Sequence, residues 1–150
     1  MQAFGSIMLT HDVSVACSPE STVTGLVASA DGKTLAWSES NNSLNILINR
    51  EELHSISIEG VIQGLFFHDN LVVFGDDNFG VRCVDIQANV EWECEISGGI
   101  SIIENCENFI AVVDNLGRLS IISHRGEILL SAKQHSSIIK LLRFRTGVIW

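Results

Sequence analysis

Short apolar runs alternate with polar, turn-prone segments along almost the whole chain. The clearest run is VEWECEI, at 90–96, where apolar residues take every second position and Glu91, Glu93 and Glu95 take the positions between. A helix would scatter these glutamates around its circumference, whereas a strand places them in one row on one face. No stretch of 12 residues combines a helical period with helix caps. The pattern therefore predicts an all-β chain.

This arrangement of runs occurs three times. The three repeats span 23–60, 61–98 and 99–136. Each repeat has four short runs separated by polar tips. The third runs of the three repeats align with one another: Leu44, Val81 and Leu119 are spaced by 37 and then 38 residues. Four short strands every ~40 residues are the sequence signature of a β-propeller blade. We therefore predict four-stranded antiparallel sheets arranged as propeller blades.

An asparagine recurs at the tip between the second and third runs. Asn41, Asn78 and Asn115 are spaced by 37 residues in both intervals. Asn and Gly adopt the positive φ angles that tight hairpins require. We therefore expect Asn78 and Asn115, with Gly80 and Gly117, to supply the positive φ angles of these turns.

The repeats resemble those of the WD40 and PQQ-like propeller families. SADGKTLAWSESNNSLNILI, at 29–48, is similar to the WD40 stretch around its Asp-Gly turn, and GRLSIISHRGEIL, at 117–129, resembles the continuation of that repeat. The resemblance covers about 23–150 and implies a propeller fold. The Trp-Asp dipeptide of WD40 repeats and the Thr-Gly-Lys of quinoprotein repeats are both missing from the matching positions, so the subfamily stays open.

The chain extends beyond the three repeats at both ends. LLRFRTGVIW, at 141–150, aligns with ASADGKTLAW, at 28–37, which predicts a partial fourth blade over 137–150. Three blades and a fraction do not close a ring, so we expect an amino-terminal fragment of a longer propeller. Residues 1–22 form a separate amino-terminal segment and are a candidate for a ring-closing strand.

The net charge and the cysteines indicate which kinds of partner and which cellular compartment to expect. A formal net charge of −9 argues against nucleic acid and against an anionic membrane, which both require a basic surface. No basic residue precedes Lys33, and no apolar run approaches the ~18 residues of a membrane-spanning helix. We expect a cytoplasmic protein whose cysteines are core thiols. The cysteines are Cys17, Cys83, Cys94 and Cys106.

Motifs that would carry catalysis are incomplete. GKT, at 32–34, has Val27 where a phosphate-binding loop requires its first glycine, and DDNFG, at 76–80, has Gln87 where a calcium-binding EF-hand loop has glutamate. G-x-S-x-G and H-E-x-x-H do not occur, and the five histidines lack metal-ligand spacing. We therefore expect no catalytic residue, no cofactor and no metal, and favour a non-catalytic role over an enzyme.

The blade topology places some of the tips on a common face. Tips between second and third strands lie on the same side of a propeller as the connections between blades, and here these segments carry acids without Lys or Arg. This predicts a uniformly acidic face that binds a protein partner, in particular a basic segment. The candidate partner-binding residues are Glu39, Asp76, Asp77, Phe79 and Asp114.

The sequence thus favours a non-catalytic propeller scaffold for protein–protein interaction through its acidic loop face. One alternative is the amino-terminal part of a PQQ-like, quinoprotein-type propeller enzyme, whose active site would lie mainly in missing blades. Another is a structural repeat module that joins other domains. A propeller frame hosts many activities, so the fold by itself does not decide among them.

Overall fold

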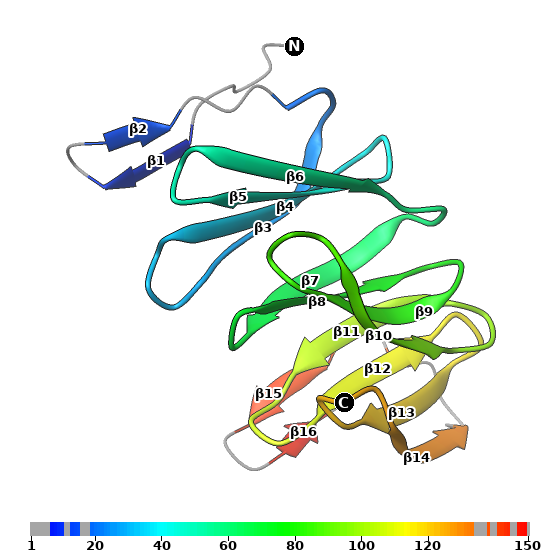
Figure 1. Ribbon diagram of the computed structural model, residues 1–150. Helices are drawn as coiled ribbons and strands as arrows, with labels where there is room; N and C mark the ends of the chain where they lie inside the picture. Colours follow the sequence, from blue (N-terminus) through cyan, green and yellow to red (C-terminus); the bar gives the residue numbers. More distant parts are fainter. Residues whose placement is uncertain are drawn as a thin grey trace.

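A computed structural model describes residues 7–10, 13–15, 19–133, 138, 141–144 and 147–149 of the chain. These residues form strands and turns, with no helix among them. The strands make three four-stranded antiparallel sheets, preceded and followed along the chain by a two-stranded sheet (Figure 1). The prediction of an all-β chain built from four-stranded antiparallel units is therefore confirmed.

The strands of each sheet follow one another in sequence order. The first four-stranded sheet contains β3 (Val23–Ala28), β4 (Thr34–Glu39), β5 (Ser43–Ile48) and β6 (Glu52–Ser57). The second contains β7 (Ile62–His68), β8 (Leu71–Asp76), β9 (Gly80–Val84) and β10 (Val90–Glu95). The third contains β11 (Ile100–Asn105), β12 (Ile110–Asp114), β13 (Arg118–Ile122) and β14 (Ile128–Lys133). The two-stranded sheets are β1 (Ile7–Thr10) with β2 (Val13–Val15), and β15 (Leu142–Phe144) with β16 (Gly147–Ile149).

The second and third strands of the sheets are buried on both faces. Successive side chains of a strand point to opposite sides, and both sides are apolar here. On β8, Phe74 packs in the core between the first and second sheets, where it meets Ala36 and Ile46. Its neighbour Val73 packs in the core between the second and third sheets with Val112. The second and third sheets therefore each contribute to two cores, as blades stacked in a propeller do.

The cysteines of the described part of the chain lie inside these cores. Cys83, Cys94 and Cys106 are buried, and Cys83 and Cys94 are unlinked thiols. Burial is the main cause that raises the pKa of the Cys83 thiol to about 12. Core placement, as expected from the sequence, is confirmed for these three residues, while Cys17 lies outside the described residues.

A bulge recurs in the pairing of the first and second strands. In each four-stranded sheet the register of this strand pair shifts once, near the beginning of the first strand. Such a bulge increases the local twist of a strand pair, and its recurrence shows that the three sheets share one geometry. The shifts fall between Val23 and Gly25, between Ile62 and Gly64, and between Ile100 and Ile102.

First strands of neighbouring sheets lie close together, with β7 in contact with both β3 and β11. Glycines permit this approach. A Cβ atom on Gly64 would lie 2.7 Å from Cγ2 of Ile103 in the third sheet, and one on Gly25 would lie 2.5 Å from Cδ2 of Leu65 in the second. A branched side chain of one blade therefore sits on a glycine of the preceding blade.

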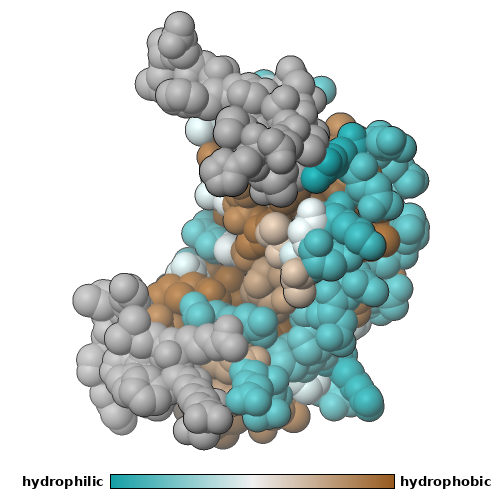
Figure 2. Space-filling view, turned by 90° about the vertical axis from the view of Figure 1, so that its left-hand side faces the viewer, coloured by the Kyte–Doolittle hydropathy of each residue, from teal (hydrophilic) through white to brown (hydrophobic). Residues whose placement is uncertain are grey.

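These first strands also line an open groove of about 660 Å³. Its apolar lining includes Val27 from β3, Leu65 and Phe67 from β7, and Ile103 from β11. Figure 2 shows the molecule hollowed on one side, with hydrophobic residues gathered in the hollow. The groove also has polar lining residues, Asp69, Glu104 and Asn105, so the inner side of the blade array combines apolar and polar side chains.

We predict that Gly64→Ala destabilises the chain by about 1–3 kcal/mol, the usual cost of overpacking, because the added methyl group would overlap Ile103. In an Ile103→Ala background the same substitution should cost much less, because the methyl group that it meets has been removed. Urea unfolding of the four proteins of this double-mutant cycle measures the coupling. An equal cost of Gly64→Ala in both backgrounds would refute the contact between blades.

Candidate functional site at the hairpin tips

The tips between second and third strands lie beside the connections between blades. The tips comprise residues 40–42, 77–79 and 115–117, and the connections comprise 58–61 and 96–99. Backbone hydrogen bonds join them: Ile58 N–H donates to Asn42 O at 2.7 Å, and Ile96 N–H donates to Phe79 O at 2.9 Å. We call the surface made by these five segments the hairpin-tip face.

An acidic residue ends the second strand of each blade. Glu39, Asp76 and Asp114 are the last residues of β4, β8 and β12, and they are only 5%, 0% and 3% exposed. A carboxylate is costly to bury unless hydrogen bonds replace its hydration. The hydrogen bonds that these three carboxylates accept therefore determine how the tips are held.

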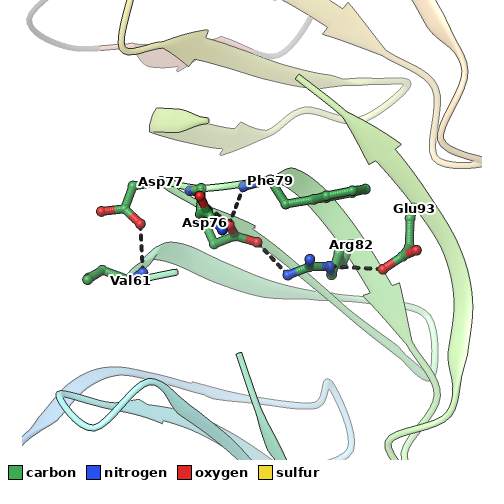
Figure 3. A network of polar contacts seen from close by, with 7 residues as sticks. Val61, Asp76, Asp77, Phe79, Arg82 and Glu93 are labelled. Carbon is green, nitrogen blue, oxygen red and sulfur yellow. Dashed lines mark hydrogen bonds and ion pairs between the residues drawn. The ribbon is translucent and has the colours of Figure 1, made fainter. Parts of the chain in front are cut away.

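Asp76 fixes the tip of the second blade (Figure 3). Its Oδ1 accepts hydrogen bonds from the backbone N–H groups of Asn78 and Phe79, at 3.0 and 2.7 Å. Its Oδ2 accepts one from Nη1 of Arg82 at 2.8 Å, and Nε of Arg82 donates to Oε1 of Glu93 on β10 at 2.9 Å. The Arg82 guanidinium also lies 4.3 Å from the centre of the Phe79 ring, a cation–π distance. One buried carboxylate thus ties the turn to two strands.

Asp114 has the same role in the third blade. Its Oδ1 accepts hydrogen bonds from the backbone N–H groups of Leu116 and Arg118, both at 2.8 Å. Hydrogen bonds to ionised groups are stronger than those between neutral groups. The tip backbone is therefore held by the residue that ends the preceding strand.

Glu39 is one methylene longer and reaches different donors. Its Oε2 accepts from the backbone N–H of Ser21 at 2.8 Å, and its Oε1 accepts from Nε1 of Trp37 at 2.9 Å and Nδ2 of Asn45 at 3.0 Å. In the first blade the buried acid therefore ties the segment before β3 to the second and third strands.

Asp77 and Phe79 differ from the buried acids. Asp77 is exposed, and its Oδ1 accepts a hydrogen bond from the backbone N–H of Val61 at 2.7 Å, which joins the tip to the connection before β7. Phe79 is half-buried. Asn115 makes the corresponding link in the third blade, since its Nδ2 donates to the carbonyl oxygen of Gly98 at 2.7 Å.

The turn conformations agree only in part with the expectation from the sequence. Gly80 and Gly117 have positive φ angles of 147° and 76°, as predicted. The prediction was wrong for Asn78 and Asn115, which are absent from the positive-φ residues of the described chain, whereas Asn42 has a φ of 62°. The backbone N–H groups of these two tips donate hydrogen bonds to strand-end carboxylates, and this fixes the turns without a left-handed conformation at either asparagine.

The five segments of the hairpin-tip face contain no Lys or Arg, and three of the predicted acids of the face are buried. Exposed acids remain at Glu59 and Asp77, on the first connection and the second tip. Arg118 and Lys133 are exposed beside the third tip, opposite one another on β13 and β14. The exposed acids of the face therefore lie above the first two blades, and a basic pair lies beside the third tip.

A stacked histidine pair lies at the junction of the second and third blades. His68 ends β7 and His124 lies in the turn between β13 and β14; their ring centres are 3.8 Å apart and the rings are nearly parallel. Nε2 of His124 is 3.0 Å from Oδ1 of Asn105, and Nε2 of His68 is 3.9 Å from Oδ2 of Asp69. The 56-residue separation of the two histidines is no multiple of the repeat, so no sequence pattern indicated this pair.

Metal-binding and membrane-spanning features are absent from the part of the chain that the structure describes. It holds no group of three or more His, Cys, Asp or Glu side chains placed to bind a metal ion. None of its segments is a helix long and apolar enough to cross a membrane.

Comparisons with known proteins establish the fold. No protein family matches the sequence, and no curated protein matches it. Among solved structures, the computationally designed protein Ika8 is similar with a TM-score of 0.72 at 16% identity, over 87% of this chain and 43% of Ika8. The designed protein Ika4 gives a TM-score of 0.69 at 16% identity, over 84% of this chain and 80% of Ika4. Raptor from Chaetomium thermophilum gives 0.70 at 10% identity, over 86% of this chain and 13% of Raptor.

These likenesses, together with the three antiparallel sheets, show that the chain has a β-propeller fold. The chain spans less than half of Ika8 and about an eighth of Raptor. At such low identities the likeness shows the fold and carries no function with it.

We predict that Asp76→Ala lowers the free energy of unfolding by about 2–4 kcal/mol, because it leaves two partly buried tip N–H groups and the Arg82 guanidinium without their acceptor. The neighbouring Asp77→Ala removes one hydrogen bond of an exposed side chain, so it should cost about 1 kcal/mol or less. Urea unfolding of the two variants measures the difference. Equal losses would show that Asp76 does not hold the tip.

We predict that the chain loses stability as the pH falls below about 6.5. Burial, and then the neighbouring His68, lower the pKa of His124 below its usual value, although Asp69 opposes the shift. The unfolded chain therefore binds a proton more readily than the folded chain near and below this pH, which favours unfolding. His124→Gln should reduce the slope of stability against pH between about pH 7.5 and 5, measured by urea unfolding. An unchanged slope would show that His124 does not contribute to it.

Proposed function

We propose that the chain is a non-catalytic propeller module that binds a basic protein segment at its hairpin-tip face. The contacting residues are Asp77 and Phe79 on the second tip and Glu59 on the first connection. The observation that carries this proposal is the second tip itself. Buried Asp76 holds its backbone in place, whereas Asp77 beside it is exposed and Phe79 is half-buried.

The five candidate residues take two roles in this proposal. Glu39, Asp76 and Asp114 are buried and hydrogen-bonded, so they hold the backbone and do not contact a partner. Asp76 and Asp114 accept hydrogen bonds from N–H groups of their tips, and Glu39 accepts one from the segment before β3. Asp77 and Phe79 are accessible and contact the partner. A surface held in its binding conformation loses less conformational entropy on association. The three buried acids therefore favour binding without themselves touching the partner.

The exposed carboxylates above the first two blades attract a basic partner. Glu59 and Asp77 carry exposed carboxylates there, and the chain has a net charge of −9, which accelerates encounter with a basic molecule. Arg118 and Lys133 lie beside the third tip, on β13 and β14, so a basic segment is attracted most strongly above the first two blades. The segment that fits this face therefore places its basic residues against Glu59 and Asp77.

Phe79 supplies the apolar part of the contact. Its ring is half-buried against the Arg82 guanidinium, which is itself held between Asp76 and Glu93. Aromatic residues with restrained side chains are frequent anchors of protein interfaces. The pairing of a fixed ring with an adjacent exposed carboxylate suits a segment that places an apolar residue next to Lys or Arg.

We predict that Asp77→Asn combined with Glu59→Gln weakens the binding of an octalysine peptide about tenfold, which corresponds to about 1.4 kcal/mol. The two amides preserve side-chain size, and the amide introduced by Asp77→Asn keeps an oxygen that can accept the Val61 hydrogen bond. Calorimetric titration at low ionic strength, where charge attraction is least screened, measures the change.

The matched control is Glu51→Gln combined with Glu107→Gln. These two exposed glutamates lie in the turns after β5 and β11, away from the hairpin-tip segments, and the variant has the same net charge as the double variant of the face. Its affinity for octalysine should stay within about twofold of the parent, and an octaglutamate peptide should bind to none of the proteins. If both double variants lose affinity equally, the peptide responds to net charge and the proposed face is refuted.

A further inference from the structure

The two-stranded sheets differ from the other three in having half the number of strands. Within the described residues, β1 pairs only with β2, and β16 pairs only with β15. Every complete blade has four strands. A strand at the edge of a sheet presents unpaired N–H and C=O groups that favour pairing with another strand. Among the residues that the structure describes, both small sheets therefore have a free edge where the complete blades have a paired strand.

The β15–β16 sheet takes the place of the first half of a blade. β15 contacts β11, the first strand of the third sheet, just as β11 contacts β7 in the second. Leu141, directly before β15, is buried in a cluster with Val113 and Leu119 of the third sheet. β15 and β16 thus correspond to the first and second strands of a blade, and the free edge of β16 is where a third strand pairs.

The β1–β2 sheet takes the place of the second half of a blade. In this array the fourth strand of one blade leads to the first strand of the next, as β6 leads to β7, and β2 leads to β3 in the same way. The β1–β2 sheet lies on the side of the first blade that faces away from the second blade (Figure 1). β1 and β2 thus correspond to the third and fourth strands of a blade.

The far side of the first blade is covered accordingly. Ala36 of β4 packs toward the second blade, so the alternation of the strand turns Leu35 and Trp37 to the opposite side. These two large apolar side chains are nevertheless only 3% and 2% exposed. The first blade therefore buries apolar residues on the side where β1 and β2 lie, as it does on the side of the second blade.

We infer that β1–β2 of one copy of this chain and β15–β16 of a second copy form one four-stranded blade, in the order β15-β16-β1-β2. Within one chain, the two half-blades lie at opposite ends of the stack of three blades (Figure 1). A second copy brings a β15–β16 half-blade to the first chain's β1–β2, and the reverse pairing forms at the other end. Two chains then contribute three complete blades each and share two composite ones, which gives a ring of eight.

The sizes of the similar designed proteins are consistent with this arrangement. Ika4 is close to this chain in length, because the matched region covers 84% of this chain and 80% of Ika4. Ika8 is about twice as long, because a match over 87% of this chain covers 43% of it. An array of this length thus corresponds to about half of a longer chain with the same fold. The inference does not depend on the proposed binding of a basic segment.

Light scattering coupled to size-exclusion chromatography tests the inference on the full 150-residue chain. We expect the mass of two chains. A variant lacking residues 1–18, which include β1 and β2, should have the mass of one chain, and so should a variant lacking 142–150, which include β15 and β16. An equimolar mixture of the two variants should regain a species of two chains, because each supplies the half-blade that the other lacks. Circular dichroism of each variant checks that its β-structure is retained.

Cross-linking of full-length chains tests the same pairing without deletions. Met8→Cys and Val148→Cys chains, both carrying Cys17→Ser, are mixed and treated with a bismaleimide. The cross-link should join Met8→Cys to Val148→Cys chains and should not form in either protein alone. A full-length chain that stays monomeric, a deletion variant that dimerises by itself, or cross-linking within a single variant would overturn the inference.

Discussion

Burial of both faces of each four-stranded sheet is the constraint that determines the other features of this chain. The middle strands carry apolar side chains on both sides, with Phe74 in one core and Val73 in the next. A blade of this kind cannot bury its own surface, so its stability comes from neighbours, as in other repeat proteins. The glycines of the first strands follow from the same constraint, because neighbouring blades meet most closely there.

Stacking of the blades also explains why the hairpin tips are well ordered. Each tip continues from strands that are held on both sides, and a buried acid at the end of the second strand accepts hydrogen bonds at or near the turn. Asp76 extends this pattern through Arg82 to Glu93 on the fourth strand. Buried hydrogen bonds therefore hold the surface that a partner would contact, and the position of the exposed Asp77 depends on the buried Asp76 beside it.

The architecture could be predicted from the sequence better than the site. Alternation in segments such as 90–96 and the 37- and 38-residue offsets were enough to indicate four-stranded blades, because both follow directly from strand geometry. The same offsets relate Glu39, Asp76 and Asp114, and this recurrence could have indicated a structural role for these acids. Whether a carboxylate at a tip points to water or back to the turn depends on rotamers and nearby donors, which a linear pattern does not show.

Contacts between blades could not be predicted from the sequence either. His68 contacts His124, and Ile103 lies on Gly64, only because whole blades stack on one another.

The second tip is a fixed element held by Asp76, and hydrogen–deuterium exchange of the Phe79 amide is the sharpest test of this statement. The Phe79 N–H donates to the buried Asp76 carboxylate at 2.7 Å. It should therefore exchange as slowly as amides of the adjoining strands β8 and β9. The amide of Gln87, which donates to Asp85 in an exposed turn, is the reference for a loop. If the Phe79 amide exchanges as fast as that of Gln87, Asp76 does not hold the tip and the proposed binding surface loses its support.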